Sequence, residues 1–409
     1  MARSARSKDV SMMRWRRWAS AIVTLSLLTA ATMAGFRSAA AQQAQGGPVS
    51  AALVEIHASP EGAGARNGRR SADAMPLYQA LKLLSATSRG ARLSLAAGTY
   101  HISALGSVRL VGGRGTGPLV IQGAGDATVL VGRFRAGDPP GAALFELARS
   151  DVAFRNFAVR NVARFIDVPN GATAERIVVA GVSIEEAHDG ILIDRGKRHS
   201  ARDWRLEDVR IFGHVRVGIR LAGPRTQHIV IRRTMIDGGG ERETNDCYKG
   251  GIQLLEAVSD VTIENVHVSR NIGCADPRYQ QGDGVEADDK QGAPRRITLR
   301  HIVSSGNRDG NFDLKAEDMT LEDLVARSDG VSRHGFRLWH YRYRCTRCRL
   351  EGESSDFQVN NATLSLLDPW PADAPPLIHC GDGRARPPSV YLVERAGRSS
   401  PETICPPPK

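Results

Sequence analysis

An eight-residue block of mostly alternating apolar and polar residues recurs along the chain, beginning 22 to 36 residues apart. This spacing is the period of a solenoid. In each block a polar or small pair interrupts the alternation, which then resumes in shifted phase, a pattern that predicts strand, tight bend and strand. The blocks are VAFRNFAV from Val152, IVVAGVSI from Ile177, WRLEDVRI from Trp204, IVIRRTMI from Ile229, VTIENVHV from Val261, ITLRHIVS from Ile297, MTLEDLVA from Met319 and YRCTRCRL from Tyr343.

A third short strand is predicted between successive blocks. Three short strands per turn of this length describe a parallel β-helix, an all-β solenoid. Each coil of such a fold buries its inward aliphatic residues only by stacking on the coils above and below. The third strands are GILI from Gly190, GIRL from Gly218, GIQL from Gly251, GVEA from Gly284, NFDL from Asn311 and GFRL from Gly335.

The repeat also predicts how the chain is divided. Residues 73–88 have the pattern of an amphipathic helix, placed where an N-terminal cap is needed, and residues 92–102 and 119–130 predict the first coils. The pattern fades after residue 353. We therefore expect a β-helix domain over residues 42–353 and a Pro-rich C-terminal cap over residues 354–409.

The first 41 residues have the pattern of an export signal. Arg14, Arg16 and Arg17 lead into the apolar run 21–36, and three alanines at 39–41 offer a cleavage site. The pair Arg16–Arg17 leaves a twin-arginine signal open as an alternative. No later apolar stretch is long enough to span a bilayer. We expect a periplasmic or secreted protein.

The charge balance excludes some partners. The formal net charge is +11, and residues 1–41 contribute seven Lys/Arg and one acid, so that +5 remains after the signal is removed. This modest surplus suits an anionic ligand such as an acidic polysaccharide. Without a basic cluster or a recognition motif, the sequence does not predict nucleic-acid binding. We expect a monomer.

All six cysteines lie in the exported part, where disulfides persist. A bridge from Cys247 to Cys274 would pin two long connections, and Cys380 and Cys405 are expected to tie down the C-terminal cap. Cys345 and Cys348 occupy inward positions, which leaves buried thiols or a local bridge across the bend.

Stacking turns the spacing of the third strands into geometry, since strands of adjacent coils lie ~4.8 Å apart and residues two apart share a face. Glu286, Asp313 and Arg337 become neighbours in one outward column. Asp288, Lys315 and Trp339 form the next column, and the turn before these strands adds Asp283, Asp309 and His334. The sequence thus predicts an acid cluster with one lysine on a single face.

The two longest connections, residues 237–250 and 271–284, precede third strands on this side. Loops on one face of a solenoid often form its binding surface. We expect them to wall a groove in which Lys249, Arg278 and Tyr279 contact a ligand, together with His334 and Trp339.

Carboxylates on a rigid scaffold suit Ca²⁺, which takes 6 to 8 oxygen ligands. Asp283, Glu286, Asp288, Asp309 and Asp313 are the candidate ligands. A bound divalent cation would lower the pKa of Lys315 and make it a competent base. This combination predicts β-elimination of a polyuronate, in which Lys315 removes the C5 proton and Arg337 stabilises the developing enolate.

The segments GDGVEADD at 282–289 and NRDGNFDLK at 307–315 resemble the calcium-dependent pectate lyases of polysaccharide lyase family 9, within the pectate-lyase-like right-handed parallel β-helix superfamily. The resemblance implies that Asp283, Asp309 and Asp313 are calcium ligands. The chain departs from the family pattern at Gly310, where the family has a second aspartate. It also has no lysine between Lys315 and Lys409, where the family places its base.

Other interpretations of the same residues remain open. Asp283 and Asp309 precede glycines, as turn formers do, and Lys315 could pair with Asp288 or Asp313. His334, Arg337 and Trp339 could form a solvated face. The enzyme could also be an epimerase or a glycoside hydrolase of acidic polysaccharide, and a hydrolase would need an acid pair such as Glu286 and Asp313. A non-catalytic β-helix could bind glycan or serve in the cell envelope.

Overall fold

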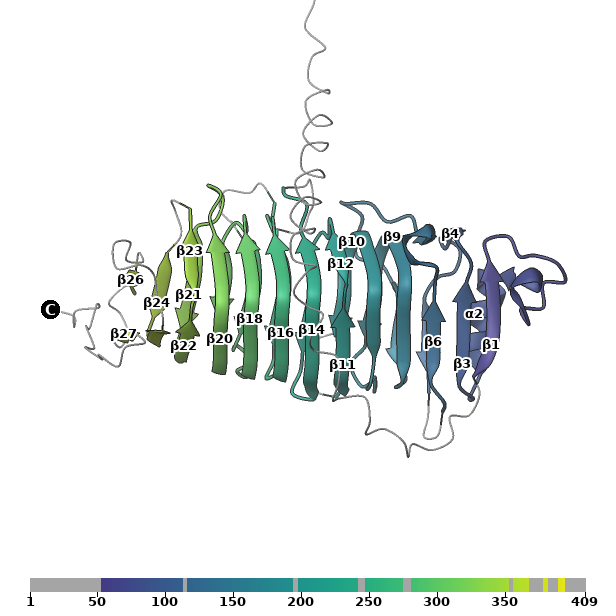
Figure 1. Cartoon of the computed structure of the whole chain (residues 1–409), viewed down its shortest axis with the longest axis horizontal. Helices are drawn as coiled ribbons and strands as arrows, with labels where there is room; N and C mark the ends of the chain where they lie inside the picture. Colours follow the sequence, from purple (N-terminus) through teal and green to yellow (C-terminus); the bar gives the residue numbers. More distant parts are fainter. Residues whose placement is uncertain are drawn as a thin grey trace, which may run out of the picture. The chain divides into compact units, whose positions relative to one another are not determined.

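The computed structural model describes residues 53–112, 116–193, 198–241, 247–274, 281–352, 356–367, 378–381 and 389–393. The predicted signal, residues 1–41, lies outside them. The described residues form a parallel β-helix, as predicted. Every strand pairing among them is parallel, and each strand of a coil pairs with its counterpart in the next coil. Figure 1 shows the strands side by side, ordered along the stack as in the sequence.

The elements alternate in the order that the repeat predicts. In the N-terminal half they are β1 (Val54–Ser59), the 3-10 turn η1 (Ser71–Asp73), β2 (Met75–Pro76), α2 (Leu77–Ala86), β3 (Ala91–Leu95), β4 (Gly98–His101), β5 (Val108–Val111), β6 (Leu119–Gln122), the 3-10 turn η2 (Gly125–Ala127), β7 (Thr128–Val131), β8 (Ala143–Ala148), β9 (Val152–Val168), β10 (Val178–Ile193), β11 (Ala201–Glu207), β12 (Arg210–Phe212) and β13 (Val217–Ala222).

The C-terminal half continues the same order. Its strands are β14 (Thr226–Asp237), β15 (Gly250–Leu255), β16 (Ser259–Ser269), β17 (Asp283–Asp288), β18 (Arg295–Ser305), β19 (Gly310–Leu314), β20 (Glu317–Arg327), β21 (His334–Trp339), β22 (Arg342–Thr346), β23 (Arg349–Glu351), β24 (Phe357–Asn360), β25 (Thr363–Leu367), β26 (Ile378–Cys380) and β27 (Ser389–Val393).

The tight bend predicted inside each block is a single residue with left-handed backbone. Arg233, Asn265 and His301 occupy this position in β14, β16 and β18, with φ of 48°, 54° and 52°. One residue in this conformation turns the strand and shifts the phase of the alternation. Strand and bend therefore form one continuous ladder in each of these coils.

The core lies inside the coils and is built by like residues stacked on like. Phe312, Phe336 and Phe357 occupy one inward position in successive coils, with ring centroids 4.7 and 4.6 Å apart. All three side chains are fully buried. Burying a phenylalanine contributes about 1.5–3 kcal/mol, so each added coil stabilises the ones beside it.

The N-terminal helix is shorter than the sequence suggested. Helix α2 begins at Leu77 instead of residue 73, because Met75 and Pro76 pair with Ala58 and Ser59 of β1. The helix turns its apolar face, which includes Leu81 and Leu84, into the core and contacts β1, β3 and β5. It thus covers the first coils, as expected of a cap.

The coil stack extends past the expected boundary at residue 353. Strand β24 pairs with β21, and β25 pairs with β22, both in parallel. Apolar residues continue to alternate inward there, as Leu364 and Leu366 do. Cys380 is disulfide-bonded, and Cys405, its predicted partner, lies outside the described residues.

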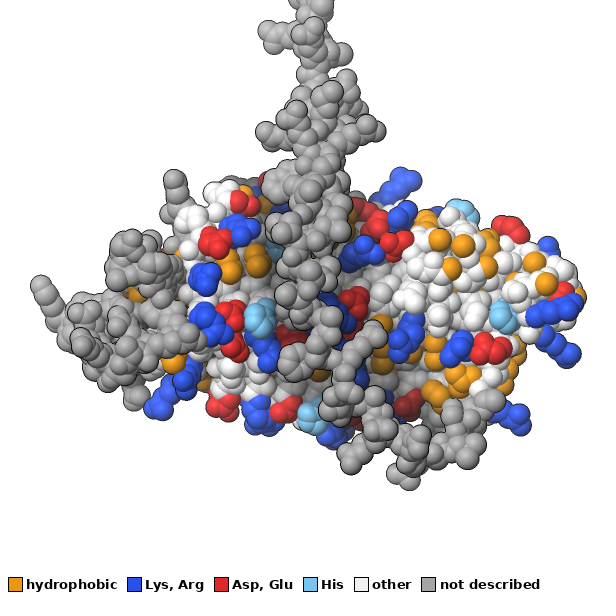
Figure 2. All heavy atoms as spheres, viewed as in Figure 1, with side chains coloured by type: hydrophobic (Ala, Val, Ile, Leu, Met, Phe, Trp, Pro, Cys, Tyr) orange, Lys and Arg blue, Asp and Glu red, His pale blue; other side chains and the backbone are white. Residues whose placement is uncertain are grey.

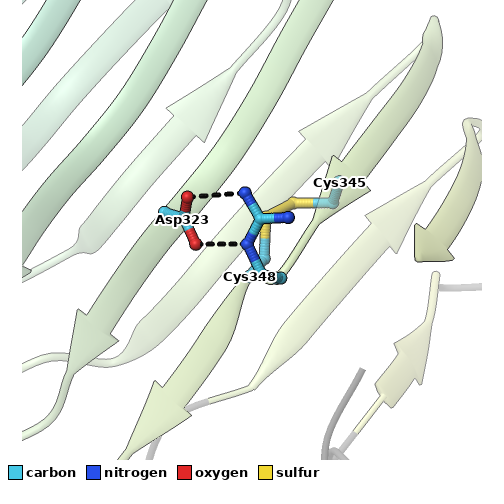
Figure 3. The surroundings of a disulfide bond; sticks show 4 residues. Asp323, Cys345 and Cys348 are labelled. Atoms are coloured by element: carbon cyan, nitrogen blue, oxygen red, sulfur yellow. Dashed lines mark hydrogen bonds and ion pairs between the residues drawn. A yellow bond between two sulfur atoms is a disulfide. The ribbon is translucent and has the colours of Figure 1, made fainter. Parts of the chain in front are cut away.

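Two disulfides join described residues. Cys247 pairs with Cys274, as predicted, and Cys345 pairs with Cys348, which selects the local bridge over buried thiols. Figure 3 shows the second bridge beside Asp323. Arg347, which lies between the two cysteines in the sequence, donates from Nε to Asp323 Oδ1 at 2.6 Å. Among the described residues, no helix is long and apolar enough to cross a membrane.

Candidate functional site

The third strands form one sheet, which we call the third-strand sheet: the last residues of β9 and β10, then β13, β15, β17, β19, β21 and β24. Its register confirms the outward column predicted from the sequence. From coil to coil the aligned residues are Asp167, Leu192, Arg220, Gln253, Glu286, Asp313, Arg337 and Gln358.

A second column passes through the turns that open these strands. It holds Asp283, then Gly310, then His334. The turn is fixed from inside by stacked asparagines, since the Asn271 side chain donates to Asn307 Oδ1 at 2.7 Å. At Gly284 an added Cβ would lie 2.2 Å from Ser304 Oγ, so only glycine fits there. These contacts hold Asp283 rigidly at the sheet edge.

Five carboxyl groups gather on this face with two cations, and we call them the acid cluster: Asp283, Glu286, Asp288, Asp309, Asp313, Lys315 and Arg337. The acids and the cations of the cluster differ in how exposed they are. The five acids are buried, with 3 to 9% of each residue exposed. The side chains of Lys315 and Arg337 are 20% and 18% exposed. The cations are therefore more accessible to a ligand than the acids are.

Arg337 joins two coils of the cluster. Its Nη1 lies 2.7 Å from Asp309 Oδ2 and 3.4 Å from Asp313 Oδ2. The Lys315 ammonium lies 3.3 Å from the same Asp313 oxygen. Trp339 completes this group, because its indole nitrogen donates to Asp313 Oδ1 at 2.7 Å.

The ring of Trp339 lies against both cations. Arg337 Cζ and Lys315 Nζ are 5.3 and 5.7 Å from its centroid, within the range of cation–π attraction. A partly exposed indole held in place by a hydrogen bond offers a flat apolar surface beside two positive charges.

Tyr248, which the sequence analysis did not select, also belongs to the site. Its hydroxyl donates to Glu286 Oε1 at 2.6 Å, and Gln253 donates to Glu286 Oε2 at 3.0 Å. Tyr248 is held next to the bridge from Cys247 to Cys274. The sequence did contain one indication of this role. Tyr248 directly follows Cys247, and a residue next to a disulfide-bonded cysteine is held close to the face that carries the site.

The packing of carboxyl groups shifts their pKa values. Burial, followed by the charges of Asp313 and Glu286, raises the pKa of Asp283 well above its usual value. Asp283 Oδ1 also lacks a hydrogen-bond partner. Burial likewise raises the pKa of Glu286, although the hydrogen bond from Tyr248 opposes the shift. Asp283 is thus the group of the cluster that most favours its protonated form.

The two cations are held in their charged forms. Burial alone would lower the pKa of Lys315, but the charges of Asp313, Glu286 and Asp288 outweigh it and raise the pKa. The pKa of Arg337 is raised in the same way by Asp313, Asp309 and Asp283. Both side chains therefore present positive charge at neutral pH.

Asp288 belongs to the acid cluster but pairs with a lysine outside it, and the side chains of His334 and Lys249 have other partners. Asp288 is at the margin, with Lys290 Nζ 3.5 Å away. His334 faces Asp356 at 3.2 Å. Lys249 is buried, and its ammonium group donates to the carbonyls of Gly238 and Gly240, so it holds its own loop closed. Arg278 and Tyr279 lie outside the described residues.

The donor set does not fit a calcium ion as it stands. Arg337 already bridges Asp309 and Asp313, and Gly310 adds no oxygen. A Cβ there would lie 3.3 Å from Asp283 Oδ1, which is a tight contact, and 3.5 Å from Arg337 Cδ, which is an ordinary one, so a side chain at this position would displace Asp283 slightly. Among the described residues no group of three or more His, Cys, Asp or Glu is placed to hold a metal. Calcium stays a prediction.

No protein-family model matches the sequence, and no curated protein matches it. Among solved structures, pectate lyase Pel9A is 13% identical with a TM-score of 0.44, over 79% of this chain and 76% of its own. The alginate lyase from Paenibacillus sp. str. FPU-7 is 14% identical with a TM-score of 0.46, over 74% and 95%. The A-module of Azotobacter vinelandii mannuronan C-5 epimerase AlgE6 is 11% identical with a TM-score of 0.43, over 78% and 94%.

These likenesses assign no activity to this chain, and the fold rests on the strand pairing itself.

Proposed function

We propose that the protein cleaves an acidic, uronate-containing polysaccharide by β-elimination at the acid cluster. The observation that carries the proposal is the layering of the cluster, in which buried acids hold Lys315 and Arg337 beside the ring of Trp339. A uronate sugar has the matching features, a carboxylate and an apolar ring face. The disulfides of the protein suit an exported protein, which could meet such a polysaccharide outside the cell.

Each residue has a defined role in this proposal. The ring of Trp339 stacks on the sugar, and Arg337 pairs with the uronate carboxylate, which acidifies the adjacent C5 proton. Lys315, in its free-base form, takes that proton, and the C4–C5 double bond forms as the C4–O4 bond breaks. O4 leaves with the bonding electron pair and takes a proton from water or from the Lys315 ammonium group. Arg337 stays protonated throughout and stabilises the enolate charge. No step is assigned to a metal ion.

Hydrolysis is a second candidate because of Asp283. Burial and neighbouring carboxylates raise its pKa, and a carboxyl group that stays protonated beside others is the usual general acid of a glycoside hydrolase. Asp313 or Asp309 would then activate water. The two candidates differ in their products, since only β-elimination leaves an unsaturated sugar.

The test is to incubate the protein with a panel of polyuronates and to follow the ultraviolet absorbance of the unsaturated product. We expect absorbance with at least one polyuronate. Lys315→Ala should lower kcat by about 100-fold or more, the usual contribution of a general base, and Arg337→Ala should lower kcat/KM similarly. Arg233→Ala, on another face and bound to Asp208, should behave as wild type.

Chelator and calcium are added in parallel to test the cofactor prediction. Activity that is lost with chelator and restored by calcium would show that the ion enters the site and moves Arg337. Reducing ends without ultraviolet absorbance would show hydrolysis. If Lys315→Ala and Arg337→Ala both retain full activity, the site is wrong.

A further inference from the structure

A buried acid surrounded by arginines lies on the same face as the acid cluster. The Asp189 side chain is fully buried, and its carboxylate receives Arg164 Nε at 3.2 Å and Arg216 Nε at 3.1 Å. His188 Nδ1 lies 2.9 Å from Asp189 Oδ2. We call Arg164, Arg216, Asp189 and His188 the basic cluster.

The strand register gives the position of the basic cluster relative to the acid cluster. Asp189 and Asp283 share one column of the third-strand sheet, through Val217 and Gly250. They are three coils apart, which corresponds to roughly 14 Å along the stack. An extended oligosaccharide of a few sugars covers this distance.

Both clusters combine buried acids with more exposed cations. Asp189 is buried, whereas the side chains of Arg164 and Arg216 are 22% and 24% exposed. Both arginines use Nε on Asp189, an arrangement that orients the guanidinium groups. Arg164 Nη1 also lies 3.5 Å from Asp167 Oδ2, so Arg216 is the better placed of the two to bind a further partner through its terminal nitrogens. Burial would raise the pKa of Asp189, but the His188 hydrogen bond and the charge of Arg216 outweigh it and hold the pKa at about 2.

A cleft adjoins the basic cluster on the side away from the acid cluster. It has a volume of about 430 Å³ and is lined by residues that include Phe134 and Ala163, the neighbour of Arg164. The Phe134 ring meets the His188 ring edge to face, with centroids 6.0 Å apart. Cleft, basic cluster and acid cluster thus follow one another along this face.

The charges of the two clusters differ in sign. Around Asp189 the charges of Arg164, Arg216 and Arg220 exceed those of Asp189 and Asp167, whereas five carboxyl groups exceed Lys315 and Arg337 in the acid cluster. A polyanion gains little binding energy from the acid cluster beyond its contacts with Lys315 and Arg337. Firm binding of an acidic chain therefore needs a positive site nearby.

We propose that Arg164 and Arg216, held by Asp189, form a subsite that binds an anionic substituent of the glycan, a carboxylate or a sulfate, three coils from the acid cluster. This inference rests on the proposed function for the identity of the ligand. It adds to that function a minimum length of substrate, because one chain must reach both clusters.

The test measures binding by titration calorimetry in a Lys315→Ala background, so that substrate is not consumed. The ligands are long and short polyuronate oligomers, a carboxyl-reduced oligomer and a sulfated glycan. Arg216→Gln should weaken binding of a long anionic oligomer by about tenfold, as loss of one charge-assisted contact does. It should leave binding of the short and the carboxyl-reduced oligomers unchanged.

Arg233→Gln is the matched control, because Arg233 also binds an aspartate but lies on another face. A thermal melt establishes that Arg216→Gln is folded, and Arg164→Gln repeats the test from the neighbouring coil. Loss that is confined to the sulfated glycan would identify sulfate as the ligand group. Unchanged affinity in both variants, or no binding of either anion by the parent, overturns the subsite. Absence of cleavage with intact anion binding would contradict the proposed function alone.

Discussion

At the scale of single residues, Asp283 shows how the fold sustains an unfavourable group. Its carboxyl is buried among other carboxyls, and one of its oxygens has no hydrogen-bond partner. Such a group lowers the free energy of unfolding when it is ionised. The protein tolerates this cost at a position where a protonated carboxyl would be useful.

The stability of the protein should therefore depend on this carboxyl. The folded-state pKa of Asp283 lies above the unfolded-state value, so its contribution to stability is full below the unfolded-state pKa and is lost as pH rises through the folded-state pKa. Asp283→Asn should raise the free energy of unfolding at neutral pH by on the order of 1–3 kcal/mol and flatten its pH dependence. Urea unfolding between acid and neutral pH measures both. Glu61→Gln, at an exposed acid, should change neither.

Lys315 leads to a prediction about the rate. Its raised pKa means that the free base is scarce at neutral pH. As the base of β-elimination it should give a kcat/KM that rises with pH and still rises above neutrality. Initial rates on one polyuronate over a pH series measure this. A rate that falls as pH rises would instead indicate that protonated Asp283 is needed, as hydrolysis requires.

The residues of the site divide into those that the sequence could predict and those that it could not. Glu286, Asp313 and Arg337 follow from alternation alone, because a parallel register converts equal positions into neighbours. Tyr248 was missed because its position depends on a loop conformation. The basic cluster was missed although Asp189 and Gly190 repeat the pattern of Asp283 and Gly284. The cluster forms only when arginines from neighbouring coils pair with Asp189, and the local sequence does not show this pairing.

At the scale of elements, the connection 237–250 carries Tyr248 to the face and is anchored by the bridge from Cys247 to Cys274. Lys249 adds a second anchor through its bonds to Gly238 and Gly240. The strand ladder alone would not place Tyr248, because Tyr248 precedes β15.

Removing the bridge should affect both stability and activity. The two cysteines are 27 residues apart, and a loop of this length predicts a loss of about 3–4 kcal/mol in the variant Cys247→Ser/Cys274→Ser. Its activity at a temperature where it stays folded should also fall, because Tyr248 is released from Glu286. Chemical unfolding and polyuronate cleavage measure the two effects.

The bridge from Cys345 to Cys348 provides the matched control. It closes a much shorter loop, with a sequence separation of 3, so Cys345→Ser/Cys348→Ser should lose less stability by the entropic argument. Equal loss of activity in both variants would show that Tyr248 does not depend on its anchor.

Element boundaries were harder to predict than element types. The helix pattern over 73–88 included Met75 and Pro76, whose pairing with β1 a local pattern cannot show. The end of the stack was placed at residue 353 because the spacing becomes irregular there, yet β24 and β25 continue the ladders of β21 and β22. Both differences arise from pairing between segments distant in sequence.

At the scale of the whole fold, parallel stacking assigns different faces to different tasks. Ion pairs between neighbouring coils, such as Arg176 with Asp151 and Arg296 with Asp260, reinforce the bends. Figure 2 shows the resulting mixture of Lys/Arg and Asp/Glu side chains over one face. The third-strand sheet differs, since it gathers five acids in one region and arginines around Asp189 in another. This separation predicts an extended, polyanionic ligand lying along the stack.

The most direct test of β-elimination is to digest a reactive polyuronate in water enriched in heavy oxygen and to weigh the products by mass spectrometry. Elimination takes no oxygen from water into the new chain ends, so we predict an unlabelled reducing end and a partner fragment lighter by one water than a hydrolytic product. A reducing end carrying heavy oxygen, with no unsaturated fragment, would contradict the account and establish hydrolysis.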